Sequence, residues 1–329
     1  MTRALLITNP AAARTEALAV RAVVDTLRAG GWSVDVLATM RAGDARRFAE
    51  EARRQGYDVV VCYGGDGTAM QITAGLLGSG IPLGLVPGGT GNLLAGNLRL
   101  PRNPVAAARA MLKAGTRPVD LGVVERSDGP HYFAVAAGAG FDAELMARTR
   151  AAEKHRWKFG AYVVRALEML PRVTSVPHRV TVDGRVHETP CAMVLVASCP
   201  ELAPPLLRLR ADAAPDDGEL DVVALKADGV FDSLGAFWDL LRGSLGGGDA
   251  GGAGRRRGWG NGARRAKRGA NGSATGRVWF DRGTTVRVEV LEGEPRPVQL
   301  DGEASGATPF EVRVLPGALP VLAGVRGRA

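Results

Sequence analysis

The sequence is poor in the residues that build disulfide frameworks and metal clusters. It holds three cysteines and four histidines among 329 residues, and no two cysteines have the CxxC spacing of a zinc site or a redox motif. Cys62, Cys191 and Cys199 fall in or beside apolar runs. We therefore expect three core thiols in a reducing compartment, and a disulfide scaffold is excluded as the basis of the fold.

Long apolar runs are also missing. No stretch approaches the roughly 18 apolar residues of a transmembrane helix, and the apolar run before Asn9-Pro10 is too short for a signal peptide. Aromatic residues make up only 5%, whereas glycine reaches 45 residues and the net charge is +8. This balance predicts a cytoplasmic globular protein with anionic partners: nucleotides, membrane surfaces or nucleic acid.

The most informative stretch contains two glycine loops, each placed between a strand and a helix. A valine-rich run (58–63) leads into the GGDGT loop, residues 64–68, and a second apolar run (81–86) leads into the PGGTGN loop, residues 87–92. Such loops let the backbone approach a ligand, and the helix that follows directs free N–H groups at phosphate. No lysine follows either loop, so neither is a Walker A motif. Asp66 suggests a magnesium-bridged phosphate contact or a proton acceptor; a helix cap is the structural alternative.

The alternation of strands and helices predicts two domains. Residues 1–120 alternate as β-α-β-α, which indicates an α/β domain with a doubly wound parallel sheet. Strand-like runs dominate residues 121–315, among them 178–187, which favours an antiparallel, β-rich second domain. The segment Gly138–Ala143 matches the pattern GxGxxG/A, and we interpret it as a tight turn rather than a dinucleotide site, because no acid follows at the expected place.

The two glycine loops carry a family resemblance. GGDGT followed by PGGTGN resembles the diacylglycerol kinase catalytic-domain family of soluble bacterial lipid kinases, a superfamily that includes sphingosine kinases, NAD kinases and phosphofructokinases. The resemblance implies an NAD kinase/phosphofructokinase-like α/β domain, an antiparallel β-sandwich, and ATP and Mg²⁺ as cofactors. It also implies that a C-terminal segment, about 316–329, could return to the first domain.

The resemblance also implies nucleotide contacts beyond the glycine loops. Asn9 follows the first predicted strand and Thr39 the second, and both places contact ATP in the family. The full implied set is Asn9, Thr39, Gly64, Gly65, Asp66, Gly67, Thr68, Gly89, Thr90 and Asn92. Two departures from the family pattern affect details of the predicted nucleotide and substrate contacts. Met70-Gln71 stands where relatives often have Asn-Glu, and Leu93 stands where they often have an acid.

Two Asp-Gly-Glu sequences are candidates for catalysis and metal binding. Gln299–Glu303 resembles the family motif QxDGE, which implies that Glu303 accepts the proton of the attacking hydroxyl and that Asp301 orients it or replaces it as the base; Asp66 completes the catalytic set. The segment 214–221 resembles a structural magnesium site with Asp217 as side-chain ligand and Ala214 and Glu219 as carbonyl ligands. An ordinary acidic turn is the alternative for each.

A basic insert, residues 243–276, interrupts the second domain. It holds seven Arg or Lys residues against the single acid Asp249, and its low-complexity composition predicts disorder. Basic residues attract anionic lipid, so the insert could bring the protein to a membrane surface; it could also bind RNA.

Together these features predict an ATP-dependent lipid kinase that phosphorylates diacylglycerol or a similar lipid at the membrane surface. The alternatives are a kinase for another hydroxyl, such as a sphingoid base, another lipid alcohol or NAD, and a catalytically weak nucleotide- or nucleic-acid-binding protein. We expect a cytoplasmic, peripherally membrane-associated protein. Nucleic acid is a disfavoured partner, and the protein could form a homodimer.

Overall fold

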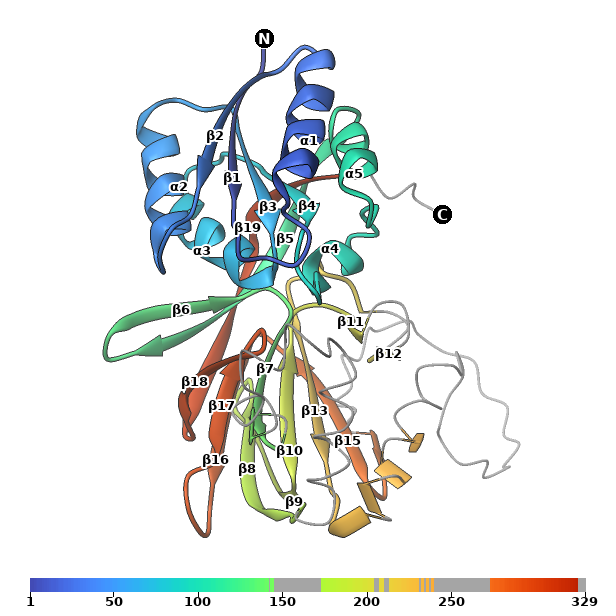
Figure 1. The fold of residues 1–329 in the computed structure, drawn as a ribbon. Helices are drawn as coiled ribbons and strands as arrows, with labels where there is room; N and C mark the ends of the chain where they lie inside the picture. Colours follow the sequence, from blue (N-terminus) through green and yellow to red (C-terminus); the bar gives the residue numbers. More distant parts are fainter. Residues whose placement is uncertain are drawn as a thin grey trace, which may run out of the picture.

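The computed structural model of the protein describes residues 1–141, 143–144, 173–203, 207–209, 213–230, 232–233, 235–236, 238–239 and 273–324. These residues form an N-terminal α/β half and a C-terminal β-sandwich (Figure 1). Most of the basic insert lies outside the described residues. No helix within those ranges is long and apolar enough to cross a membrane.

The N-terminal half is built on four parallel strands. In spatial order these are β2 (Ser33–Ala38), β1 (Arg3–Thr8), β3 (Val59–Gly64) and β4 (Leu83–Pro87). The helices between and after them are α1 (Ala17–Ala29), α2 (Asp44–Arg54), α3 (Asp66–Leu76), α4 (Leu93–Asn97) and α5 (Pro104–Met111). The doubly wound α/β prediction is confirmed.

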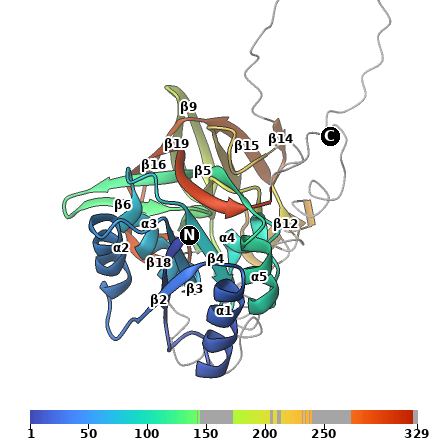
Figure 2. The ribbon, with the colours of Figure 1, turned by 90° about the horizontal axis from the view of Figure 1, so that it is seen from above.

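The helices cover both faces of this sheet (Figure 2). Successive side chains of a strand point to opposite faces, so Leu5 and Ile7 of β1 pack into the cluster that contains α2 and α3. Ala4 and Leu6 pack on the other face, in the cluster with α1 and α5. Because both faces of the parallel sheet are covered by helices, side chains on both sides of each strand are apolar. The strands therefore appear in the sequence as continuous hydrophobic runs.

Two long strands connect the halves. These are β5 (Gly115–Arg126), which continues into the hairpin strand β6 (Gly129–Phe133), and β19 (Phe310–Ala323). They pair antiparallel along most of their length, and Val321 of β19 also pairs in parallel with Leu83 of β4. The predicted boundary at residue 120 therefore falls inside a strand shared by both halves, and the chain up to residue 323 lies beside the N-terminal sheet.

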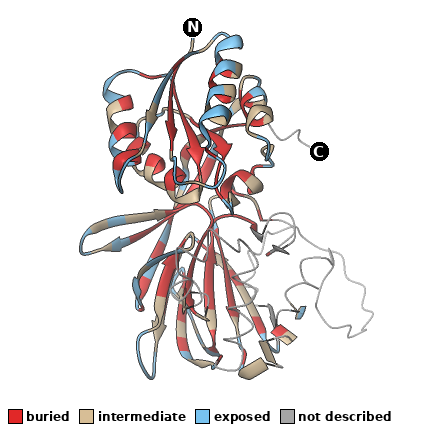
Figure 3. Ribbon diagram, viewed as in Figure 1, coloured by how far each residue is buried: buried red, intermediate tan, exposed pale blue. Residues whose placement is uncertain are grey.

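The C-terminal half is a sandwich of two antiparallel sheets, as predicted. One sheet continues from β19 through β16 (Thr285–Val290), β8 (Val176–Val182) and β9 (Arg185–Cys191). The other has the order β14 (Ser273–Thr275), β15 (Val278–Gly283), β13 (Leu220–Leu225), β10 (Met193–Ala197), β7 (Ala136–Gly140), β17 (Pro297–Leu300) and β18 (Glu303–Ala307). A short pair, β11 (Glu201–Ala203) and β12 (Leu207–Arg208), stands apart. Buried valines of both sheets, such as Val180 and Val222, form the core, and Figure 3 shows buried positions along the strands of both sheets.

Three local expectations were wrong. The run 178–187 is a hairpin rather than one strand, because the chain reverses at Asp183-Gly184, where both φ angles are positive. Gly138–Gly140 belong to strand β7 rather than to a tight turn. Residues 273–275, expected as part of the disordered insert, form β14 and pair with β15.

The cysteine expectation is confirmed: all three are free, buried thiols. Burial raises the pKa of each thiol, so none is a reactive thiolate.

Candidate functional site

The two glycine loops touch each other at the carboxyl edge of the parallel sheet. The Gly88 N–H donates to the Gly64 carbonyl over 2.8 Å. A Cβ on Gly89 would lie 2.6 Å from the Cα of Gly65, closer than real Cβ atoms approach. Only glycine allows this contact, so the two loops form one continuous backbone surface.

Helix α3 begins earlier than the sequence predicted. Gly65 is its N-cap and Asp66 its first residue, so residues 66–68 of the GGDGT loop are the first helical turn. The N–H groups of that turn have no acceptor within the helix. They are available for an anion at the carboxyl end of β3, as expected of a phosphate-binding loop.

Asp66 links the two loops. Its Oδ1 accepts a hydrogen bond from the Leu94 N–H at 3.3 Å, and a Cβ on Gly91 would lie 3.1 Å from its Oδ2. Withdrawal from water raises the pKa of the Asp66 carboxyl, and the N–H groups at the start of α4 oppose that shift. The alternative expectation, in which Asp66 caps the helix that follows its own loop, is wrong: α3 has no side-chain cap hydrogen bond, and Asp66 instead caps α4.

Asn9 and Thr39 lie at the ends of β1 and β2 on the same edge. Asn9 Nδ2 donates to Thr68 Oγ1 over 3.2 Å, which places Asn9 against the GGDGT loop. The Thr39 N–H donates to the Thr8 carbonyl at 2.9 Å, so Thr39 lies one strand farther from the loops. Asn92, in a left-handed conformation, closes the PGGTGN loop through two hydrogen bonds with Gly89, at 2.9 and 2.7 Å.

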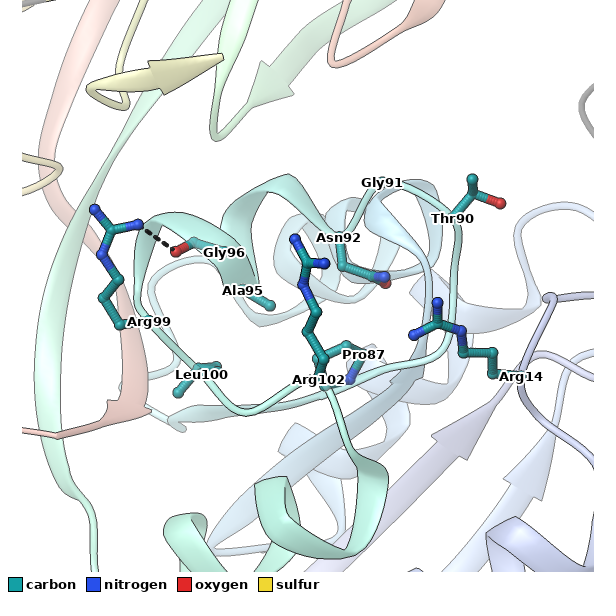
Figure 4. Close-up of a pocket in the computed structure, with 10 residues that line it drawn as sticks. All are labelled: Arg14, Pro87, Thr90, Gly91, Asn92, Ala95, Gly96, Arg99, Leu100 and Arg102. Atoms are coloured by element: carbon teal, nitrogen blue, oxygen red, sulfur yellow. Dashed lines mark hydrogen bonds between the residues drawn. The ribbon is translucent and has the colours of Figure 1, made fainter. Parts of the chain in front are cut away.

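A pocket of about 510 Å³ opens beside the PGGTGN loop and is lined by three arginines that the sequence analysis missed (Figure 4). They are Arg14, Arg99 and Arg102. The Arg14 N–H donates to the Gly88 carbonyl at 3.0 Å, which holds its segment against the loop. Arg99 pairs with Glu201, whereas Arg14 and Arg102 make no ion pair with any described residue. The pocket is therefore positively charged and suited to an anion.

Asp301 is held by the main chain of a distant segment. Its Oδ2 accepts from the Ala134 N–H at 2.8 Å, and its Oδ1 accepts from the N–H groups of Val135 and Ala136, both at 2.9 Å. Desolvation raises the pKa of Asp301 to about 6, against these three hydrogen bonds. Its φ of 47° places it in the turn between β17 and β18. Because both oxygens are engaged, Asp301 is built to hold this turn in position.

Glu303 projects from the same turn toward the GGDGT loop. A Cβ on Gly67 would lie 2.6 Å from Glu303 Oε1, so the carboxylate of the C-terminal half rests against the loop of the N-terminal half. The two residues line one pocket of about 120 Å³ with Met70, His131 and Tyr132. Residues 236 positions apart in the sequence thus meet at one point.

The predicted metal site around Asp217 is a hydrogen-bonded turn. Asp217 accepts from the N–H groups of Ala214 and Glu219, both at 3.1 Å. Arg282, which the sequence analysis missed, lies 3.6 Å from the Asp217 carboxylate and 3.1 Å from that of Glu219. No cluster of three metal-ligating side chains occurs in the described parts of the chain, so a magnesium ion here stays a prediction.

Comparison with known proteins agrees with this architecture. A model of the diacylglycerol kinase catalytic domain matches residues 3–124, and a model of the YegS C-terminal NAD kinase beta sandwich-like domain matches residues 135–245. The chain is 34% identical over 183 residues to a diacylglycerol kinase of Mycobacterium tuberculosis, covering 54% of this chain and 58% of that protein. That match therefore spans less than two thirds of the relative's length.

Two further comparisons cover more of the chain. A diacylglycerol kinase of Bacillus subtilis is 30% identical over 249 residues, which is 74% of this chain and 80% of that protein. A solved structure of a diacylglycerol kinase from Bacillus anthracis superposes with a TM-score of 0.69 over 98% of this chain and 97% of that one, at 22% identity. The fold is thus that of these enzymes, and the chain belongs to the diacylglycerol kinase catalytic-domain family of lipid kinases.

Proposed function

We propose that the protein transfers the γ-phosphoryl group of ATP to a lipid hydroxyl, with diacylglycerol or a similar lipid as acceptor. The observation that carries the proposal is the position of Glu303 against Gly67. A carboxylate at the phosphate-binding loop can take the proton of a hydroxyl as that hydroxyl attacks. The relatives named diacylglycerol kinase support the same acceptor class.

The phosphates of ATP are proposed to bind along the two glycine loops. First-turn N–H groups of α3 supply positive charge on this side, together with the guanidinium groups of Arg14 and Arg102, which pair with no residue that the structure describes. Phosphoryl transfer needs little covalent chemistry from the protein, because positioning and charge stabilisation lower most of the barrier. Asn9 and Thr39 remain the proposed contacts for the rest of the nucleotide.

The residues around Asp66 fit a magnesium ion that is shared with ATP. Mg²⁺ commonly takes one or two protein carboxylates and completes its coordination with substrate phosphates and water, so the single carboxylate of Asp66 is enough. When bound, the ion would neutralise charge on the phosphate oxygens. Leu94 N–H, 3.3 Å from Asp66 Oδ1, would help to fix the orientation of the carboxylate.

Glu303 and Asp301 are assigned different tasks. The Glu303 carboxylate has no hydrogen-bond partner in the described chain and lines the pocket of about 120 Å³, so it is the proposed proton acceptor. Asp301 has both oxygens occupied by main-chain N–H groups, which favours a positioning role over that of alternate base.

The proposed place of action is a membrane surface, which the protein reaches from the water. The basic insert, with seven Arg or Lys residues, is the proposed contact with anionic lipid. Each basic residue near such a surface contributes on the order of 1 kcal/mol.

The direct test is phosphorylation of a panel of acceptors by the purified protein with radiolabelled ATP. The panel contains diacylglycerol, a sphingoid base, a long-chain alcohol and NAD, each lipid dispersed in detergent. We expect magnesium-dependent transfer to diacylglycerol above the others. Transfer to NAD alone would replace the lipid assignment, and ATP binding with no transfer to any acceptor would leave a nucleotide-binding protein.

A further inference from the structure

Two pockets meet on the acceptor side of the site. The inner one, of about 120 Å³, holds Glu303 and is lined at its outer end by His131 and Ser305. The outer one, of about 610 Å³, is open to solvent and lies between the β5–β6 turn and strand β18. Both pockets share His131, Ala304 and Ser305. They therefore form one path that ends at Glu303.

Arg126 lines the outer pocket and has N–H donors without an acceptor in the described chain. Its Nη2 donates to the Ser305 carbonyl, while Nη1 has no acceptor and Nε is buried without one in the described chain. The acids beside it in sequence are engaged elsewhere: Glu125 with Arg313 at 3.6 Å, and Asp128 with His131 at 3.0 Å. Arg126 is thus a cation without an ion pair among the described residues.

The backbone of β18 is shaped around this guanidinium group. Gly306 has a φ of 72°, and a Cβ there would lie 2.6 Å from Arg126 Nη1. A side chain at this position would displace the guanidinium, so glycine at 306 leaves room for Arg126 beside the strand. A freely moving surface arginine would need no such space.

Ser305 supplies a second polar atom at the same place. Its Oγ is buried and has no hydrogen-bond partner in the described chain. Ser305 is two residues from Glu303 on β18, and both residues line the inner pocket. Because a buried polar group without a partner is costly, the Ser305 hydroxyl is a candidate hydrogen-bond donor for a bound ligand.

We propose that Arg126 and Ser305 form an acceptor subsite that binds a second oxygen of the lipid while its hydroxyl lies at Glu303. The ligand chemistry is a hydrogen-bond-accepting oxygen a few bonds from the reacting hydroxyl. An ester carbonyl of a diacylglycerol has this chemistry, and so does a phosphate oxygen of a phospholipid headgroup. The inference rests on the proposed function. It adds a second group of the lipid, an oxygen, that the enzyme recognises besides the hydroxyl.

The test compares three acceptors in detergent: a diacylglycerol, the dialkylglycerol of equal chain length, which keeps the hydroxyl but lacks both carbonyls, and phosphatidylglycerol. The variants are Arg126→Met and Ser305→Ala. Arg179→Met is the matched control, because Arg179 lies on β8, pairs with Glu188 and lines neither pocket. Initial rates give kcat and KM for each lipid and for ATP.

We expect the wild type to prefer an acceptor with a carbonyl or phosphate oxygen over the dialkylglycerol, whose ether oxygens are weaker hydrogen-bond acceptors. Arg126→Met should lower kcat/KM for that acceptor by about 10- to 100-fold, the range for a hydrogen bond to a charged group, and Ser305→Ala by about 2- to 10-fold. Rates with dialkylglycerol and the KM for ATP should stay near those of wild type and of Arg179→Met. A selective loss with diacylglycerol identifies a carbonyl, and one with phosphatidylglycerol identifies a phosphate.

Equal losses with the ester and ether lipids would overturn the subsite, because Arg126 would then only hold β18 in place. If Arg126→Met fails to fold, Ser305→Ala decides the question alone, since it removes one oxygen atom from a surface strand; an unchanged ester-to-ether ratio in that variant overturns the proposal. A wild-type protein that phosphorylates no lipid would overturn the proposed function, and the subsite with it.

Discussion

The contact between Gly67 and Glu303 predicts a specific cost for one added methyl group. In Gly67→Ala the new Cβ would lie 2.6 Å from Glu303 Oε1, and ordinary contact begins at about 3.4 Å. The carboxylate must therefore move by about 0.8 Å. A misplacement of about 1 Å at a reacting group can reduce the rate about 10²-fold, so we expect kcat for the lipid to fall by that order.

The assay is a double-mutant cycle with Glu303→Asp. The shorter side chain withdraws the carboxylate by one methylene, so it removes the collision while itself lowering activity. Adding Gly67→Ala to Glu303→Asp should then cost little more, which gives a coupling energy of about 0.5–3 kcal/mol, the range for residues in contact. Binding of an ATP analogue is measured for each variant, so that a loss of nucleotide affinity is not mistaken for lost turnover.

Gly65→Ala is the control from the same loop. Its Cβ would meet the Cα of Gly89 at 3.4 Å and come near no atom of Glu303, so its effect should multiply with that of Glu303→Asp. If Gly67→Ala and Glu303→Asp also multiply, the two residues are not in contact in the active protein. The N-terminal and C-terminal halves would then not meet through Gly67 and Glu303.

Four further outcomes are expected. Asp66→Asn should nearly abolish transfer in a folded protein, because an amide is a poor magnesium ligand; normal turnover would remove Asp66 from the mechanism. Glu303→Gln should cut kcat about 10²–10⁴-fold with ATP affinity retained; a larger loss in Asp301→Asn would move the base to Asp301. The pKa of Asp301 is raised to about 6, so its contribution to the free energy of unfolding is greatest below pH 4 and falls by up to about 3 kcal/mol as the pH rises through 6. Urea denaturation from pH 4 to 8 should show that Asp301→Asn lacks this fall. An identical pH dependence in the wild type and the variant would contradict the raised pKa. Deleting residues 246–270 should leave activity on detergent-dispersed lipid intact and weaken sedimentation with anionic vesicles, less so at high salt; loss of single-stranded RNA binding with unchanged vesicle binding would move the insert to nucleic acid.

The N-terminal half was predictable because its signals are local. The apolar strands, the glycines after β3 and β4 and the helices between them occur in one continuous stretch, and the doubly wound arrangement of β1–β4 follows from their alternation. Helix α3 started at Asp66 rather than at residue 69, because a loop and a first helical turn both accommodate small residues such as those of GGDGT.

The remaining features depend on residues far apart in the sequence. Nothing near Asp301 indicates that its carboxylate is held by the N–H groups of residues 134–136, at separations of 165 to 167 residues. Arg14 contacts the PGGTGN loop although 74 residues separate it from Gly88. Arg282 reaches the turn of Asp217 from β15, and an isolated arginine in a strand gives no sign of its partner.

The place of β19 has a consequence for biosynthesis. Residues 310–323 emerge from the ribosome after everything that precedes them, yet they lie between β4 and the β-sandwich. Until they emerge, β4 has no neighbour on one side, and an unpaired strand edge is prone to wrong pairing. The nascent N-terminal half therefore holds both glycine loops while its sheet is still incomplete. The two halves should mature together late in synthesis rather than one after the other, and a ribosome stalled before residue 310 should carry a chain unable to retain nucleotide.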